Sequence, residues 1–300
     1  MIKKIYIKLK SKGIGGLLEE IYFLILPPRL KSYQSYKRYF QFKVGLEIGG
    51  PSTVFGRQGF IPVYPIAMRI DNCTFACKTV WESEISEGDT FFFYEGRSPG
   101  HYYITEASDL SLIKSDSYDF ILSSHCIEHI ANPIKALSEW IRVLKADGMF
   151  VLVVPHKDGT FDHRRPVTLF KHLIQDYKMQ TNESDITHLE EILRLHDLTK
   201  DPGAGDYESF LKRSKQNAQN RCLHHHVFDT RLVVEMIHYV GLQILAVELF
   251  RPYHIVIVSK KIKPGRKIDN SKFREVSASL LGRSPFPSDR KMSSLPGFRN

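Results

Sequence analysis

A glycine turn that directly follows an acid is the chain's clearest chemical signal. Residues 44–52 read as a buried strand that ends at Gly49 and Gly50, with Glu47 just before the turn. Because glycine has no Cβ, such a turn lets a ligand approach the backbone closely, and a carboxylate at a strand end can hold a cationic or hydroxylated group. The turn therefore indicates a binding site for a small polar ligand.

Polar residues also follow later predicted strands at comparable positions. We predict strands that end near Asp71, near Glu106 and at Ser124, and a further apolar strand over 149–154. Parallel strands bring their carboxyl ends to one edge of a sheet, where ligands bind in a crevice. The spacing thus predicts a nucleotide pocket across this edge.

The remaining pattern completes an alternating α/β order. Prolines and glycines between residues 51 and 65 predict an irregular loop where a helix would otherwise follow the first strand. The other predicted elements are a strand over 118–124, helices over 133–144 and 230–239, and strands over 242–250 and 254–259. The short link at 251–253 predicts that the last two strands form an antiparallel hairpin. Residues 157–226 are polar and histidine-rich, and we expect them to form a helical insertion above the strand ends.

The charge lies at the two ends of the chain. The 300 residues carry a net charge of +9, but residues 1–43 hold ten Lys/Arg against two acids and residues 260–300 hold eleven against three, so the part between them carries about −7. We therefore expect a basic N-terminal helical arm over 1–43, one domain over 44–261, and a basic, loosely ordered tail over 262–300. This distribution disfavours nucleic acid as a partner and leaves peripheral contact of the termini with an anionic membrane open.

The cysteines and the N-terminal segment bear on the cellular compartment. Cysteines at 73, 77, 126 and 222 show neither zinc-ligand spacing nor a disulfide framework, which favours the cytoplasm. Residues 14–26 are too short and too charged for a transmembrane helix, so an amphipathic helix is expected, docked on the core or resting on a membrane surface.

The ordered set of motifs resembles class I S-adenosylmethionine-dependent methyltransferases, and most closely the type 11 methyltransferase-domain group. The similarity covers about residues 44–156 and 228–261, and its most specific part is Ser117-Tyr118-Asp119-Phe120-Ile121-Leu122-Ser123-Ser124-His125-Cys126-Ile127-Glu128-His129. Segments 160–166 and 224–229 are similar to a subset associated with bacterial surface polysaccharide synthesis. The resemblance implies a Rossmann-like, mostly parallel sheet with an antiparallel last strand, and an insertion between the fifth strand and the next helix.

The resemblance also implies a role for each matching residue toward S-adenosylmethionine. Glu47, Gly49 and Gly50 match the motif around the methionine part of the cofactor, and Asp71 matches the acid that binds the ribose hydroxyls. The same comparison places Glu106 and Ala107 beside the adenine and Ser124 beside the sulfonium. This chain departs from the family at Pro51 and Thr53, where further glycines are usual.

Methyl transfer to a hydroxyl needs a base, and His125 at the end of the fourth strand is the best-placed candidate. His163 in the insertion is a second candidate base, with Arg164 and Arg165 available for an anionic substrate group. Glu128 and His129 are expected to orient the loop. No pair of possible ligands has the spacing of a metal motif, so no metal is expected.

Three functions remain open on the sequence. The first is a methyltransferase that acts on a small-molecule or glycan-type acceptor, at a hydroxyl. The second is a nicotinamide-dependent oxidoreductase or epimerase, although GxGxxG is absent. The third is a non-catalytic adaptor in a glycan-synthesis assembly, which the altered glycine turn and basic arms favour.

Overall fold

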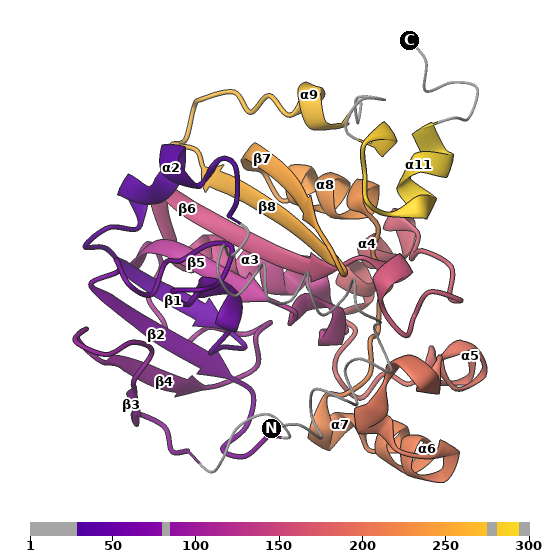
Figure 1. Cartoon of the computed structure of the whole chain (residues 1–300). Coiled ribbons are helices and arrows are strands. Elements are labelled where there is room, and N and C mark those ends of the chain that lie inside the picture. Colours follow the sequence, from indigo (N-terminus) through magenta and orange to yellow (C-terminus); the bar gives the residue numbers. More distant parts are fainter. Residues whose placement is uncertain (1–28, 80–84, 275–280, 294–300) are drawn as a thin grey trace, which may run out of the picture.

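An eight-stranded sheet lies at the centre of the molecule (Figure 1). The structure is a computed structural model that describes residues 29–79, 85–274 and 281–293. The strand order is β3-β4-β2-β1-β5-β6-β8-β7. The strands are β1 (Val44–Ile48), β2 (Arg69–Thr74), β3 (Thr90–Phe91), β4 (Gly100–Ile104), β5 (Tyr118–Ser124), β6 (Leu144–Pro155), β7 (Leu242–Phe250) and β8 (His254–Lys261).

Five neighbouring strands, β4, β2, β1, β5 and β6, run parallel. Strand β8 is antiparallel to both β6 and β7, and the edge strand β3 is antiparallel to β4. Residues 149–154 of β6 are at most 1% exposed, as expected for an apolar strand covered on both faces. The predicted Rossmann-like sheet and its C-terminal hairpin are confirmed.

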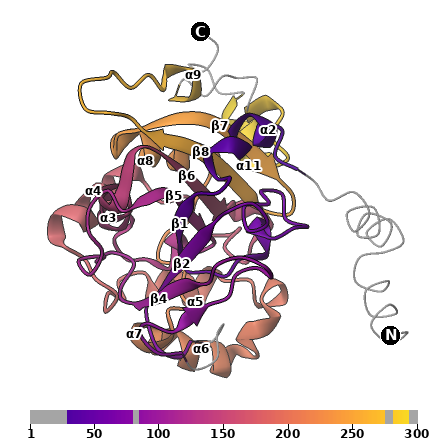
Figure 2. The ribbon, with the colours of Figure 1, turned by 90° about the vertical axis from the view of Figure 1, so that its left-hand side faces the viewer.

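Different parts of the chain cover the two faces of the sheet (Figure 2). One face packs against α3 (Pro133–Val143), α4 (Phe170–Met179) and α8 (Thr230–Tyr239). The other face is covered by α2 (Tyr33–Tyr36), the adjoining 3-10 turn Lys37–Tyr39, and the loop over 53–67. Apart from the 3-10 turn Thr53–Phe55, residues 49–68 form no helix, as their prolines and glycines predict.

Helix α3 shows how the sequence positions the segment after β5. The side chain of Asn132 accepts a hydrogen bond from the Lys135 amide at 3.1 Å, and Pro133 occupies the first turn. The buried face includes Trp140, whose indole N–H donates to the Ala107 carbonyl at 2.7 Å. This bond ties the helix to the loop after β4.

Strand β2 extends further than the sequence predicts. Its expected end was Asp71, but Cys73 pairs with Ile48 on one side and with Tyr103 on the other, and Thr74 pairs with Ile104. The polar residues of this stretch are buried rather than at a strand end, because both neighbouring strands continue alongside them. Asp71 consequently lies inside the strand.

The insertion lies between β6 and α8, as predicted. It contains α4, α5 (Leu189–Leu195), α6 (Tyr207–Lys215), α7 (Asn217–Asn220) and the 3-10 turns Lys157–Gly159, Leu198–Lys200 and Pro202–Ala204. Helices α5, α6 and α7 stand beside the sheet as a separate group in Figure 1. Their own apolar core is small, with Ile192, Ala204, Phe210 and Leu223 buried.

Parts of both terminal segments pack on the sheet. The amides of Lys31 and Ser32 donate to the Glu248 carboxylate at 2.7 and 2.9 Å. Beyond β8, the described part of the expected loose tail includes α9 (Ser271–Arg274) and α11 (Pro287–Ser293), and Asp289 in α11 is fully buried. The expectation of a loosely held tail is thus wrong for residues 281–291. The amphipathic helix predicted over 14–26 lies outside the described residues, and no helix among the described ones has the length and apolar character needed to pass through a bilayer.

Candidate functional site

A cavity of about 780 Å³ opens where β1, β2, β4 and β5 end. Gly49, Gly50, Glu106, Ala107, Ser124 and His125 all line it, so the fold brings together six of the nine predicted site residues. The opposite wall comes from the insertion and includes Thr160, Phe161, Glu183, Lys200, Arg221 and His224. The volume falls within the range of about 300–1,000 Å³ typical of small-molecule sites.

Gly49 begins the turn in a conformation that favours glycine. Its φ is +73°, and its amide donates to the Cys73 carbonyl at 2.9 Å. A Cβ on this residue would lie 2.9 Å from the Cys126 Sγ, closer than normal contact allows. The missing side chain therefore permits both the turn and the close packing of Cys126 against it.

Side chains of β1 and β2 hold the rest of the turn through hydrogen bonds. The Asn72 amide group clamps Gly50, accepting from its N–H at 3.1 Å and donating to its carbonyl at 3.0 Å. The Glu47 carboxylate accepts from the Ser52 amide at 3.0 Å and from the Tyr64 hydroxyl at 2.6 Å. Glu47 is fully buried and does not line the cavity, so it supports the turn instead of lying beside a ligand.

Asp71 is also absent from the cavity wall, contrary to its predicted place. Its carboxylate accepts from the Tyr118 hydroxyl at 2.7 Å and from the His101 amide at 3.1 Å, and it lies 3.2 Å from Arg69. At 1% exposure it links β2 to β4 and β5. The prediction failed because β2 continues for three residues beyond it, and Thr74 takes the place at the strand end that lines the cavity.

Glu106 and Ala107 lie where the sequence predicts, at the cavity edge after β4. The Glu106 carboxylate pairs with the Arg221 guanidinium from the insertion. That guanidinium also stacks 5.1 Å from the centre of the Phe75 ring, just after β2. This ion pair links the loop after β4 to the insertion and closes one side of the cavity.

His125 lies between an imidazole and a carboxylate. Its Nε2 is 2.8 Å from His254 Nδ1, and its Nδ1 is 3.7 Å from Glu128 Oε1. Burial and the neighbouring His125 lower the pKa of His254 to about 3, so His254 is neutral. Glu128 is 2% exposed, and its Oε2 has no hydrogen-bond partner. Burial alone would raise the pKa of Glu128, but nearby histidines hold it below the usual value.

A second pair of histidines flanks Glu128 at the cavity wall. His129 Nδ1 donates to the Leu223 carbonyl at 3.1 Å, and burial lowers its pKa to about 4. His224 Nδ1 bonds to Asp162. Burial alone would raise the pKa of Asp162, but His224 and Arg165 bring it down to about 2. Glu128, His129 and His224 are close enough for one atom of each to bind a shared metal ion, an arrangement that their spacing in sequence did not predict.

The other predicted residues of the insertion are used within the protein. His163 does not line the cavity; its Nε2 is 2.8 Å from Asp197 Oδ2, which also lies 3.3 Å from Arg164. Arg165 is 1% exposed and donates to Asp162, Glu191 and the His224 carbonyl. The structure therefore does not support His163 as a second base or Arg165 as a site for an anionic substrate group. Both side chains bond to other residues of the insertion.

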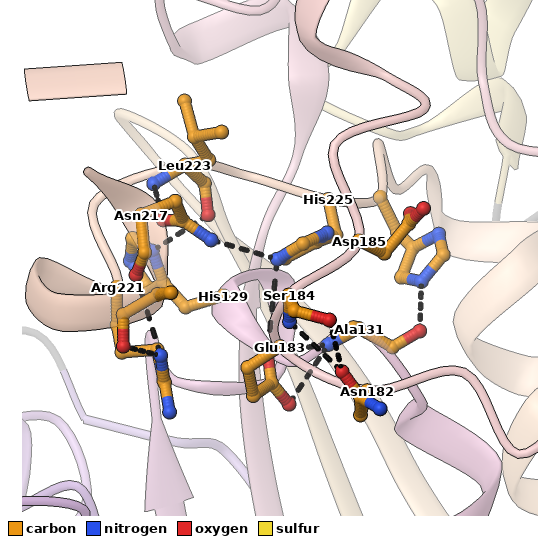
Figure 3. Close-up of polar contacts among 12 residues, drawn as sticks. His129, Ala131, Asn182, Glu183, Ser184, Asp185, Asn217, Arg221, Leu223 and His225 are labelled. Atoms are coloured by element: carbon orange, nitrogen blue, oxygen red, sulfur yellow. Dashed lines mark hydrogen bonds and ion pairs between the residues drawn. The ribbon is translucent and has the colours of Figure 1, made fainter. Parts of the chain in front are cut away.

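Glu183 is a cavity residue that the sequence did not reveal (Figure 3). Both of its carboxylate oxygens accept from the Ala131 amide, at 3.1 and 3.2 Å, and Oε2 is 3.7 Å from His225 Nε2. Burial raises its pKa to about 7. It belongs to a polar loop without periodicity, so no signal in the sequence separates it from an exposed acid.

Comparison with known proteins gives one family match. Residues 75–152 match the methyltransferase domain family. No curated protein matches the chain significantly.

Several solved structures resemble the chain at low sequence identity. One S-adenosylmethionine-dependent methyltransferase, from Methanosarcina mazei, is 14% identical, with 78% of this chain and 99% of that chain covered and a TM-score of 0.41. Another, from Listeria monocytogenes, is 14% identical, with 77% and 97% covered and a TM-score of 0.42. The Burkholderia thailandensis 1,6-didemethyltoxoflavin-N1-methyltransferase, solved with S-adenosylhomocysteine, is 12% identical, with 87% and 88% covered and a TM-score of 0.42.

The family match covers residues that form much of the cavity. The matched residues run from the end of β2 through β5 and α3 into β6, and therefore include the strand ends and the loop that form much of the cavity. The sheet around them is Rossmann-like, with parallel strands and the antiparallel β8 beside β6. Residues 75–152 of this chain are thus similar to the methyltransferase domain family, and they lie within a Rossmann-like sheet.

Proposed function

We propose that the protein methylates a hydroxyl group of a small-molecule or glycan-type acceptor in the cavity between the strand ends and the insertion. The observation that carries this proposal is His125, a cavity-lining imidazole held between His254 and Glu128. A hydroxyl is a poor nucleophile until it loses its proton, and an imidazole beside a carboxylate can accept that proton.

The cavity residues fit the methyl donor, S-adenosylmethionine, which supplies a methyl group activated by its sulfonium. Gly49 and Gly50 line the cavity at the turn where its methionine part would lie, with Ser124 beside the sulfonium. Ala107 adjoins the adenine. With Asp71 outside the cavity, Glu106 is the carboxylate beside β2 that can accept bonds from the ribose hydroxyls.

The amides of the turn limit how the donor's carboxylate can be held. Those of Gly49, Gly50 and Ser52 bond to Cys73, Asn72 and Glu47 respectively. The donor carboxylate must therefore use other groups. Lys200 and Arg221 are cationic side chains in the same cavity wall.

His125 can take up the acceptor's proton at Nδ1. In the assignment that we propose, its Nε2–H donates to His254 Nδ1, which leaves Nδ1 as the basic atom on the side of Glu128. The buried carboxylate then stabilises the imidazolium that forms. His129 and His224, on the other side of Glu128, are placed to contact the acceptor.

Replacing His125 tests the proposed base. We expect His125→Ala to lower turnover by about 10²–10⁴-fold, because a positioned base is lost, while calorimetric affinity for S-adenosylhomocysteine stays within a factor of two. His163→Ala is the matched control and should keep its turnover, since His163 lies outside the cavity. Normal turnover by His125→Ala would remove His125 as the base.

The acceptor class is tested by the stability of the product. Extracts of the producing cells, incubated with the enzyme and methyl-labelled donor, should yield a labelled small molecule or glycan whose methyl group survives mild alkali, as an ether does. Label in an alkali-labile ester or on a nitrogen would contradict a hydroxyl acceptor, and label on protein or nucleic acid would contradict a small-molecule or glycan acceptor.

A further inference from the structure

Four metal-binding side chains converge inside the insertion, outside the cavity wall. His172 and Asp176 are one turn apart on α4, His188 directly precedes α5, and His226 lies in the segment that leads to α8. None of these four described residues lines the cavity. The fold thus brings three distant segments of the sequence to one point.

Their separations match a tetrahedral site. His172 Nε2 is 2.9 Å from His188 Nε2 and 3.4 Å from Asp176 Oδ2, which is 3.7 Å from His226 Nε2. Ligands at 2.0–2.1 Å from a tetrahedral Zn²⁺ lie about 3.3 Å from one another. The three histidines each offer a nitrogen within 4.8 Å of the other two. The three measured separations, 2.9, 3.4 and 3.7 Å, thus lie within a few tenths of an ångström of the separation expected for zinc ligands.

Two buried atoms of the group have no hydrogen-bond partner. They are Asp176 Oδ2 and His226 Nδ1, in side chains that are 10% and 1% exposed. Burying such atoms unpaired is costly; a bound cation would satisfy Asp176 Oδ2, whereas His226 can offer the ion only one of its two ring nitrogens. His226 Nε2 lies 3.1 Å from the Ala131 carbonyl, so binding through Nδ1 would keep that bond and binding through Nε2 would replace it.

We propose that His172, Asp176, His188 and His226 bind one Zn²⁺ ion that holds the insertion together. Four protein ligands with no open position are typical of a structural zinc site, and imidazole with carboxylate suits this ion. The group joins α4, which packs on the main core, to the polar loop over 180–188 and the segment before α8. Because that loop carries Glu183, the ion would also fix one wall of the cavity.

Metal analysis of the full chain, purified without a histidine tag, tests this site. We expect about one Zn²⁺ per chain, and after chelation we expect one Co²⁺ to bind with the visible absorption of tetrahedral coordination. His188→Ala and Asp176→Asn should each weaken Co²⁺ binding by at least about 10-fold. Asp176→Asn is nearly isosteric, and circular dichroism of both variants checks that they fold.

The second group of possible ligands provides the matched control. His129→Ala and His224→Ala remove two of the three residues in the Glu128 group and should leave Co²⁺ affinity unchanged. The proposal is overturned if the wild-type chain binds neither ion, if His188→Ala and Asp176→Asn bind like wild type, or if only the two control variants lose the metal.

Discussion

Three acids that the sequence placed at strand ends have different environments in the structure. Glu47 and Asp71 are buried in the sheet and satisfy backbone amides and tyrosine hydroxyls, whereas Glu106 reaches the cavity. A buried carboxylate needs such partners, because ionised groups are costly to desolvate. The two buried acids therefore support the fold, and of the three only Glu106 can contact a ligand in the cavity.

Asp71→Asn separates a structural role from cofactor binding. We expect the free energy of unfolding to fall by about 1–3 kcal/mol, because Asn accepts the bonds of Tyr118 and His101 less well. Affinity for S-adenosylhomocysteine should not change, since Asp71 does not line the cavity. Urea unfolding and calorimetry measure the two quantities. Weaker binding with unchanged stability would restore Asp71 as a cofactor ligand.

Glu183 should make stability depend on pH near neutrality. Burial raises its pKa from 4.5 to about 7, so between these values the folded protein keeps a proton that the unfolded chain has lost. The free energy of unfolding therefore decreases as pH rises through this window. In Glu183→Gln this decrease should be smaller by about 1–3 kcal/mol between pH 5 and pH 8.

Urea unfolding at several pH values checks this expectation. Glu190→Gln, at an exposed acid of the same region, is the control and should follow the wild type. Parallel pH curves for wild type and Glu183→Gln would show that Glu183 titrates at its ordinary pKa.

The bounds of helices and strands could be predicted where the sequence is periodic. The strand over 118–124 and the helix over 230–239 have the predicted bounds, because apolar residues recur there at the spacing of each structure. The end of β2 was missed because Asn72 and Thr74 are polar, although both are buried in the strand. The cavity wall built by the insertion was missed for a related reason: Glu183 and Arg221 lie in segments without periodicity, and only tertiary contacts bring them to the site.

Helix α11 is held on the protein by a buried carboxylate, that of Asp289. Its Asp289 carboxylate lies 3.2 Å from His156 and accepts the hydroxyls of Thr230 and Ser284 at 2.7 and 2.6 Å, all in the interior. Asp289→Ala should lower the free energy of unfolding by about 3 kcal/mol, because it leaves these groups unpaired. Glu208→Ala, at an exposed acid, should have little effect in the same thermal and urea melts. Equal stability of both variants would show that α11 does not depend on Asp289 for its docking.

At the scale of the molecule, the cavity lies between a sheet of conventional order and an insertion made largely of polar residues. The sheet supplies Gly49, Glu106 and Ser124, and the insertion supplies the opposite wall. The Glu106–Arg221 pair bridges the two parts. In the proposed function, the sheet side of this cavity binds the donor and the insertion faces the acceptor.

Calorimetric titration of S-adenosylhomocysteine into wild type, Gly49→Ala and Gly96→Ala tests whether the methyl donor binds at the glycine turn. Both glycines have φ +73°, but a Cβ meets Cys126 at Gly49 and meets nothing within 4 Å at Gly96. We predict that wild type and Gly96→Ala bind with equal affinity and that Gly49→Ala binds at least about 10-fold more weakly, a difference of about 1.4 kcal/mol. Absence of binding to the wild type, or equal binding by all three proteins, would contradict a donor site at the glycine turn.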